Sequence, residues 1–191
     1  MFAWTEGDDV MELVQPIRDK ELLEAMKREL LRMGYRDYML LVLGINTGLR
    51  ISDILKLKVS DVKDLSYIKM HEQKTGKFKR IKISGIADEI EKYIAGMDDD
   101  AYLFKSQKGD NKPISRVQAY RILNKAAVRV GINGEIGTHT LRKTFGYHMY
   151  MKTKDVALLQ ELFNHSSPSV TLRYIGINQD RLDQAMDDFR L

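Results

Sequence analysis

The spacing of apolar residues restricts the fold more than any other feature of the sequence. Along most of the chain, apolar residues recur at the intervals typical of an α-helix, and in only one stretch do they alternate with polar residues as in a β-strand. Residues 22–30 repeat leucine and methionine at helical intervals. The almost wholly apolar run 38–45 predicts a buried helix, which Thr47 and Gly48 end. We expect a further helix to begin near Arg50.

The alternating stretch predicts the β-structure of the chain. Residues 67–71 and 78–83 place apolar and polar side chains on opposite faces, as half-buried strands do. The four residues 74–77 between them include Gly76 and are typical of a turn. The pattern therefore predicts one antiparallel β-hairpin.

Residues that commonly cap helices mark most of the remaining elements. Ser115 is expected to open one helix, and Ser167 followed by Pro168 another that runs through Tyr174. The other expected elements are a helix over 86–95, an extended segment over 102–104, a loop over 131–137, and helices from Thr138 through Met151, from Thr153 through Phe163 and from Asn178 onward, the last with Leu182, Met186 and Phe189 on one side. Together they predict one mainly α domain with a small antiparallel β-sheet, an α+β fold.

Composition excludes several classes of protein. With 43% hydrophobic residues in 191, the chain has enough apolar material for a core. It has no apolar run of the roughly 18–20 residues that a membrane helix needs, and its first residues are acidic where a signal peptide is basic. The absence of cysteine excludes disulfides, a thiol nucleophile and thiolate zinc sites, and leaves only a histidine and carboxylate metal site open. We expect a cytoplasmic protein without a membrane partner.

Charge is concentrated in the middle of the chain. Residues 1–15 carry four acids and no base, and residues 178–191 carry four acids and two arginines. The whole chain has 31 basic and 27 acidic residues, so 29 basic and 19 acidic residues lie between these two ends. The middle of the chain therefore has a net charge of +10. A basic body of this kind suits nucleic acid. On charge alone, a solvated lysine-rich face explains it equally well.

Four polar residues lie next to apolar segments, at positions where packing of a hydrophobic core does not explain a polar side chain. Arg50 cannot lose its proton, so a semi-buried guanidinium needs an anion, and Asp53 one turn later is a candidate to orient it. A purely structural Arg–Asp pair is the alternative. His139 and Arg142 share one face of a helix start, a favourable place for a phosphate. The alternative for His139 is a helix cap or a hydrogen-bonded core histidine.

Three sequence blocks resemble the catalytic domain of the tyrosine recombinases, the phage-integrase type. Residues 47–57 resemble its first signature block, residues 138–145 are similar to its His-x-x-Arg block, and residues 162–165 with 171–174 resemble its final histidine and tyrosine. The blocks stand in the family's order. The resemblance covers residues 16–191. It therefore implies that residues 1–15 are an acidic N-terminal extension and that the family's usual N-terminal core-binding domain is absent. The sequence is then either a fragment of a longer protein or one of the short, single-domain recombinases.

The resemblance also implies a chemistry for each matching residue. Tyr174 would attack a DNA phosphate and form a 3′-phosphotyrosyl link with a free 5′-hydroxyl. The implied partners of this nucleophile are Arg50 and Arg142 on the phosphate oxygens, His139 at the tyrosine proton, His165 as a hydrogen-bond donor to the phosphate, Lys74 as the acid for the leaving oxygen, and Asp53 as the support of Arg50. Lys69 and Lys77 lie close enough in sequence to compete with Lys74. Asn164 and Lys143 depart from the family's usual glycine and histidine at their positions.

The implied function is that of a site-specific DNA recombinase or integrase that uses no metal, cofactor or ATP. Its partner would be double-stranded DNA, and its location the nucleoid. The C-terminal helix is a candidate to connect protomers of a tetramer on DNA, and the alternative is that it packs on the core of its own chain or frays. The isolated chain is expected to be a monomer. The alternatives are a non-catalytic DNA-binding module of the same fold and a relaxing enzyme like the type IB topoisomerases.

Overall fold

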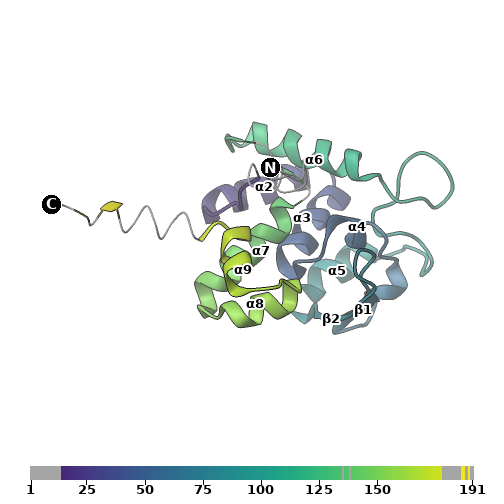
Figure 1. The fold of residues 1–191 in the computed structure, drawn as a ribbon. Helices are drawn as coiled ribbons and strands as arrows, with labels where there is room; N and C mark the ends of the chain where they lie inside the picture. Colours follow the sequence, from purple (N-terminus) through teal and green to yellow (C-terminus); the bar gives the residue numbers. More distant parts are fainter. Residues whose placement is uncertain (1–13, 135, 138, 178–185, 188, 190–191) are drawn as a thin grey trace, which may run out of the picture.

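Two consecutive helices begin the described part of the fold. α2 (Lys20–Met33) starts where the carboxylate of Asp19 accepts hydrogen bonds from the backbone N–H groups of its first turn. Gly34 separates α2 from α3 (Tyr35–Thr47). The computed structural model describes residues 14–134, 136–137, 139–177, 186–187 and 189 (Figure 1).

The other elements confirm a mainly helical domain with one small antiparallel sheet. In chain order they are α4 (Ile51–Ile54), η1 (Val59–Asp61), β1 (Tyr67–His71), β2 (Phe78–Lys82), η2 (Ser84–Ile86), α5 (Ala87–Ile94), α6 (Arg116–Arg129), α7 (Thr140–Thr153), α8 (Val156–Phe163) and α9 (Pro168–Tyr174). As expected, Ser115 and Ser167 cap α6 and α9 by accepting hydrogen bonds from backbone N–H groups. Among the described residues, no helix is both long enough and apolar enough to cross a bilayer.

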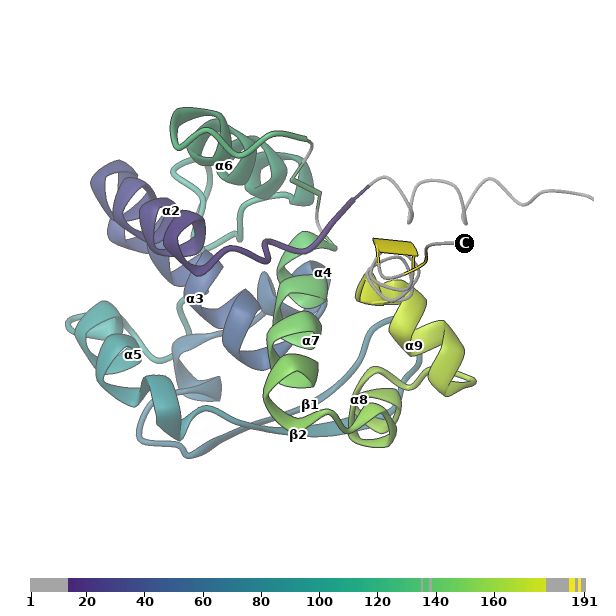
Figure 2. The ribbon, with the colours of Figure 1, turned by 90° about the vertical axis from the view of Figure 1, so that its left-hand side faces the viewer.

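α3 is the central helix of the core. Residues 39–43 are almost completely buried, because α2, α5, α6 and α7 all pack against α3 (Figure 2). The helix ends at Gly48, whose φ of 63° favours glycine. A Cβ atom at Gly48 would also collide with the ring of Phe145 on α7. This close contact holds the end of α3 against the beginning of α7.

The buried apolar residues form two clusters. The large cluster joins α2 through α6 and reaches Leu141 on α7. The small cluster packs α7, α8 and α9 together, and its buried members are Phe145, Leu159, Phe163, Tyr174, Ile175 and Ile177. α7 therefore contacts both clusters, and α9 belongs to the small one.

The predicted antiparallel hairpin is confirmed, and it is attached to α8. Tyr67 pairs with Lys82 and His71 with Phe78 across the two antiparallel strands. The ammonium group of Lys79 on β2 donates a hydrogen bond of 2.9 Å to the carbonyl oxygen of Leu162. Lys77 also donates to the side-chain oxygen of Asn164. These contacts fix the hairpin beside the end of α8.

Several predicted boundaries are wrong. Thr153 does not open α8, because Lys154 adopts a left-handed conformation that ends α7 one residue later, and Asp155 provides the cap through a 3.0 Å hydrogen bond from the N–H group of Leu158. The helix expected from Arg50 is only four residues long. The segment over 102–104, expected to be extended, is largely a turn. Isolated β-bridges pair Tyr102 with Lys58 and Lys105 with Pro113. Thr138 and most of the helix expected from Asn178 lie outside the described residues.

Candidate active site

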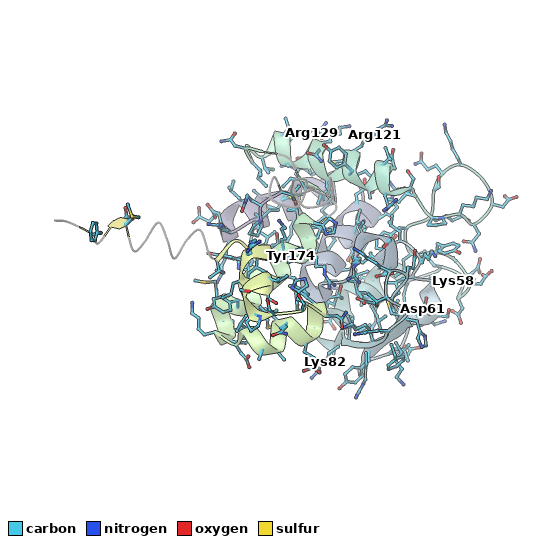
Figure 3. All side chains as sticks on the ribbon, in the orientation of Figure 1. Lys58, Asp61, Lys82, Arg121, Arg129 and Tyr174 are labelled. Carbon is cyan, nitrogen blue, oxygen red and sulfur yellow. The ribbon has the colours of Figure 1, made fainter. Side chains whose placement is uncertain are left out.

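The candidate active site lies where α7, α8 and α9 meet the start of α4 and the hairpin turn. Tyr174 is the last residue of α9, and Figure 3 labels it among the side chains of this part of the molecule. Its side chain is 8% exposed, and its ring packs edge-on against Phe163 and His165. Burial raises the pKa of the Tyr174 hydroxyl, whereas Arg142 and Arg50 oppose this rise.

His139 is a polar partner of Tyr174. Its Nδ1 atom lies 3.2 Å from the tyrosine oxygen, within hydrogen-bonding distance. His139 occupies the N-cap position of α7, but its side chain makes no capping hydrogen bond, which excludes the capping role. Burial and the nearby cations Lys143 and Arg142 lower the pKa of His139, so its ring is neutral at pH 7 and able to accept a proton.

Arg142 is buried in the first turn of α7 and connects three parts of the chain. Its guanidinium donates hydrogen bonds to the carbonyl oxygen of Gly48 and, at 3.2 Å, to that of Phe163. The guanidinium carbon also lies 4.4 Å from the centre of the Phe163 ring. Both carbonyls are at helix C-termini, where cations are favourable. The geometry therefore holds the Arg142 charge beside Tyr174.

Arg50 has a different counter-ion from the one that the sequence predicts. Its Nη1 atom lies 2.7 Å from Oε1 of Glu72, and the side chains of Arg50 and Glu72 are 19% and 1% exposed. Asp53, the expected partner, is buried and accepts a 3.2 Å hydrogen bond from the backbone N–H of Gln73. The direct Arg50–Asp53 pair is not formed, because Asp53 faces the start of the hairpin turn.

Glu72 is a site residue that the sequence reasoning missed. Its second carboxylate oxygen accepts a 2.7 Å hydrogen bond from the hydroxyl of Thr75, inside the same turn. Burial would raise the pKa of Glu72, but the hydrogen bond from Thr75 and the adjacent positive charge of Arg50 bring it below the ordinary value. Burial raises the pKa of Asp53. Glu72 is therefore the carboxylate that is more readily ionised beside Arg50.

The second predicted histidine also packs against Tyr174. His165 follows Asn164, whose φ of 56° confirms the expected left-handed end of α8. Its Nδ1 atom lies 3.1 Å from the hydroxyl oxygen of Thr171, and its ring centre lies 5.0 Å from that of Tyr174. Burial, with Arg142 and Arg50, lowers the pKa of His165 to about 4.

The lysines near the site differ in their surroundings. Lys74 is exposed at the hairpin turn, and its charge is among those that lower the pKa of His139. Lys77 contacts Asn164, and Lys69 is exposed on β1. Lys143 donates a 2.7 Å hydrogen bond to the carbonyl oxygen of Val14, and its ammonium lies 5.3 Å from the Tyr174 ring centre. Lys143 thus adds a positive charge beside Tyr174 at the position where the family often has histidine.

Taken together, four of the five side chains expected to act with Tyr174 lie around it, namely Arg50, His139, Arg142 and His165. The fifth, Lys74, is exposed at the hairpin turn. Among the described residues, no three histidine, aspartate or glutamate side chains form a group that could hold a metal ion. The positive charge of the site comes from arginine and lysine.

Comparisons with known proteins show which sequences this chain resembles. The chain is 53% identical over 171 residues to the probable integrase/recombinase YoeC of Bacillus subtilis (strain 168), an alignment that covers 89% of this chain and 93% of YoeC. It is 30% identical over 172 residues to the tyrosine recombinase XerA of Pyrococcus furiosus, with 88% of this chain and 58% of XerA covered. The chain therefore spans nearly all of YoeC and little more than half of XerA.

A solved structure has the same fold. The XerH site-specific recombinase, crystallised with a palindromic difH substrate as a post-cleavage complex, matches 92% of this chain with a TM-score of 0.67 and 22% identity, over 53% of XerH. The helical domain and its tyrosine, arginine and histidine cluster define a catalytic domain of the tyrosine recombinase type. Residues 15–181 match the Phage integrase family, and the chain belongs to this family.

Proposed function

We propose that this chain is a site-specific DNA recombinase in which Tyr174 breaks and rejoins a DNA strand through a covalent 3′-phosphotyrosyl intermediate. The observation that carries the proposal is the contact between the Tyr174 oxygen and Nδ1 of His139, 3.2 Å apart, beside the buried Arg142. A nucleophile, a proton acceptor and a fixed cation are the parts that in-line attack on a phosphodiester needs.

The first step of the proposed reaction forms one bond and breaks another. The Tyr174 hydroxyl gives its proton to His139, and its oxygen forms a bond to the phosphorus atom. The bond between phosphorus and the 5′ oxygen of the next nucleotide breaks, and that oxygen takes a proton from Lys74. The 5′-hydroxyl of another strand reverses these steps, so rejoining needs no ATP.

The arginines supply the electrostatic part of the mechanism. Arg50 and Arg142 would donate hydrogen bonds to the non-bridging phosphate oxygens, on which negative charge increases in the transition state. Their positions agree with this role, because Glu72 holds Arg50 and two backbone carbonyls hold Arg142. His165 would add a further hydrogen bond to the phosphate. We therefore propose that the reaction is independent of metal ions.

Lys74 is proposed as the acid on the strength of its place in the hairpin turn. Its side chain is exposed, so it is free to follow the leaving oxygen, and its charge is close enough to lower the pKa of His139. Lys77 is the weaker candidate because it is hydrogen-bonded to Asn164. Lys69 lies on β1, away from the turn.

The proposal extends to partners and organisation. We propose that double-stranded DNA is the substrate, that residues 16–191 form the catalytic domain behind an acidic extension, and that the enzyme acts at the nucleoid. The proposed active assembly is a tetramer on two duplexes, connected through the C-terminal segment. These parts of the proposal rest on family membership and on the basic body of the chain.

Formation of a protein–DNA adduct tests the function directly. Nicked duplexes that tile the DNA flanking the coding sequence are mixed with the protein, because a nick beside the cleavage point releases the 5′ end and traps the tyrosyl intermediate. The wild-type chain should give an adduct that survives denaturing electrophoresis, with and without EDTA. Tyr174→Phe should give none, while its urea unfolding midpoint remains close to that of the wild type.

Other results of this experiment would support the alternative functions. DNA binding without an adduct in the wild-type chain would overturn the proposal in favour of a non-catalytic binding module. An adduct on every duplex, together with relaxation of supercoiled plasmid at any sequence, would overturn site specificity in favour of a topoisomerase-like enzyme. Loss of the adduct in EDTA would overturn metal independence.

A further inference from the structure

A second basic surface lies between α2 and α6. It is a groove of about 400 Å³, which we call the basic groove, and its cationic lining residues are Arg32, Arg36, Arg121, Lys125 and Arg129. Figure 2 shows α2 and α6 on the other side of α7 from α9. Figure 3 labels Arg121 and Arg129 along α6, apart from Tyr174. The groove is therefore separate from the candidate active site.

The positive charges of the basic groove are only partly compensated. Glu29 pairs with Arg129 at 2.6 Å and lies 3.8 Å from Arg32, and Asp37 pairs with Arg36 at 2.7 Å. Five cations thus face two carboxylates. Arg121 and Lys125 are exposed and form no ion pair with any residue that the structure describes.

The spacing of the α6 cations is unfavourable for the helix alone. Arg121, Lys125 and Arg129 follow one another at intervals of four residues, so like charges lie on neighbouring turns of one face and repel. An anion in the groove would remove this repulsion. The three positions extend over about 12 Å of helix, which is the axial rise of three to four nucleotides of one DNA strand.

We propose that the basic groove binds the sugar–phosphate backbone of a second segment of DNA while the first occupies the candidate active site. Four of the five cations are arginines, whose planar guanidinium groups donate paired hydrogen bonds to phosphate. An acidic amphipathic peptide fits less well. The apolar lining residues are Met33 and Ile122, and Ile122 is only 5% exposed, so little apolar surface is available to such a peptide.

The consequence for the proposed function is that one chain holds two DNA segments on opposite sides of α7. This inference does not depend on the covalent chemistry, because the groove contains none of the side chains around Tyr174. It depends on charge, on exposure and on the separation of the groove from α9. A binding assay can therefore test it separately from strand cleavage.

The experiment is a bridging assay with the full chain. A biotinylated 30-base-pair duplex of arbitrary sequence on beads is incubated with the protein and a fluorescent duplex of the same length. The wild-type chain should retain the fluorescent duplex, and the double variant Arg121→Gln/Lys125→Gln should lose most of this retention. The control Lys92→Gln/Lys152→Gln removes two exposed charges from α5 and α7 and should bridge like the wild type.

Salt dependence and cleavage complete the test. Loss of two phosphate contacts should reduce the slope of log K against log salt concentration by about 2. The groove variant should still form the Tyr174 adduct, so failure of bridging and failure of cleavage are distinguishable. Equal bridging by the groove and control variants would overturn the proposal. So would an unchanged salt slope combined with loss of oligoglutamate binding, which would assign the groove to an acidic protein partner.

Discussion

Replacement of Glu72 by glutamine should weaken both the fold and the candidate active site. The carboxylate of Glu72 is the counter-ion of Arg50 at 2.7 Å, and it accepts a hydrogen bond from Thr75 in the hairpin turn. Glutamine keeps the size of the side chain and removes its charge. Arg50 would then keep its own charge in a partly buried position without a compensating anion.

The expected loss of stability follows from the burial of the pair. Two unit charges about 4 Å apart attract by about 4 kcal/mol at an effective dielectric constant near 20. The neutral glutamine avoids the cost of burying a charge, and Arg50 is 19% exposed, so solvent compensates part of the loss. We expect Glu72→Gln to lower the free energy of unfolding by about 1–3 kcal/mol at pH 7.

The stabilisation by Glu72 should depend on pH, and the lowered pKa of Glu72 gives the direction of this dependence. The pKa of Glu72 is lower in the folded protein than its ordinary value of 4.5. The stabilising charge is therefore fully present above pH 4.5 and is lost as pH falls through the lowered pKa. The wild type and Glu72→Gln should thus differ at pH 7 and converge in acid.

Urea unfolding followed by circular dichroism measures this difference. The matched control is Asp99→Asn, whose ion pair with Lys63 has the same 2.7 Å distance but side chains that are 47% and 65% exposed. The control should unfold at the wild-type urea concentration, because exposed pairs contribute little. If Glu72→Gln also unfolded there, or if its difference from the wild type persisted unchanged in acid, the reasoning on the buried counter-ion would be refuted.

Two further predictions concern the small apolar cluster. The lowered pKa of His165, about 4, should keep its NMR ring resonances constant from pH 8 to pH 5, and stability linked to the neutral ring should be lost only as pH falls from 6.5 toward 4. A midpoint above pH 6 would contradict this. Gly146→Ala should destabilise the protein by about 1–3 kcal/mol. The reason is that a Cβ atom there would lie 2.7 Å from side-chain atoms of Ile175 and Phe163. An unchanged thermal midpoint would refute that packing.

Features set by a few neighbouring residues could be predicted from the sequence. Ser115 and Ser167 are caps because their hydroxyls accept hydrogen bonds within the next three residues. Asn164 ends α8 because asparagine tolerates a left-handed backbone. Lys154 adopts the same conformation without the residue type that signals it, so the boundary between α7 and α8 was predicted wrongly.

Contacts between distant segments could not be predicted in the same way. Glu72 reaches Arg50 only because the hairpin turn folds back on α4, and the sequence offers the nearer Asp53 as a partner. The hydrogen-bond partners of Arg142 are the carbonyl oxygens of Gly48 and Phe163, and carbonyl groups carry no residue-type signal. The resemblance to a family named Arg50 and Arg142 as expected site residues, whereas the groups that contact them could be found only in the fold.

The division of the core into two clusters separates the proposed nucleophile from one of the cations proposed to act with it. Tyr174 packs in the small cluster with α8 and α9, whereas Arg50 stands at the start of α4, next to the large one. Loosening of the small cluster would move the nucleophile and leave Arg50 in place. The arrangement of Tyr174 beside Arg50 would then be lost before the helical fold, so that loss of the proposed activity on heating would precede the melting of secondary structure.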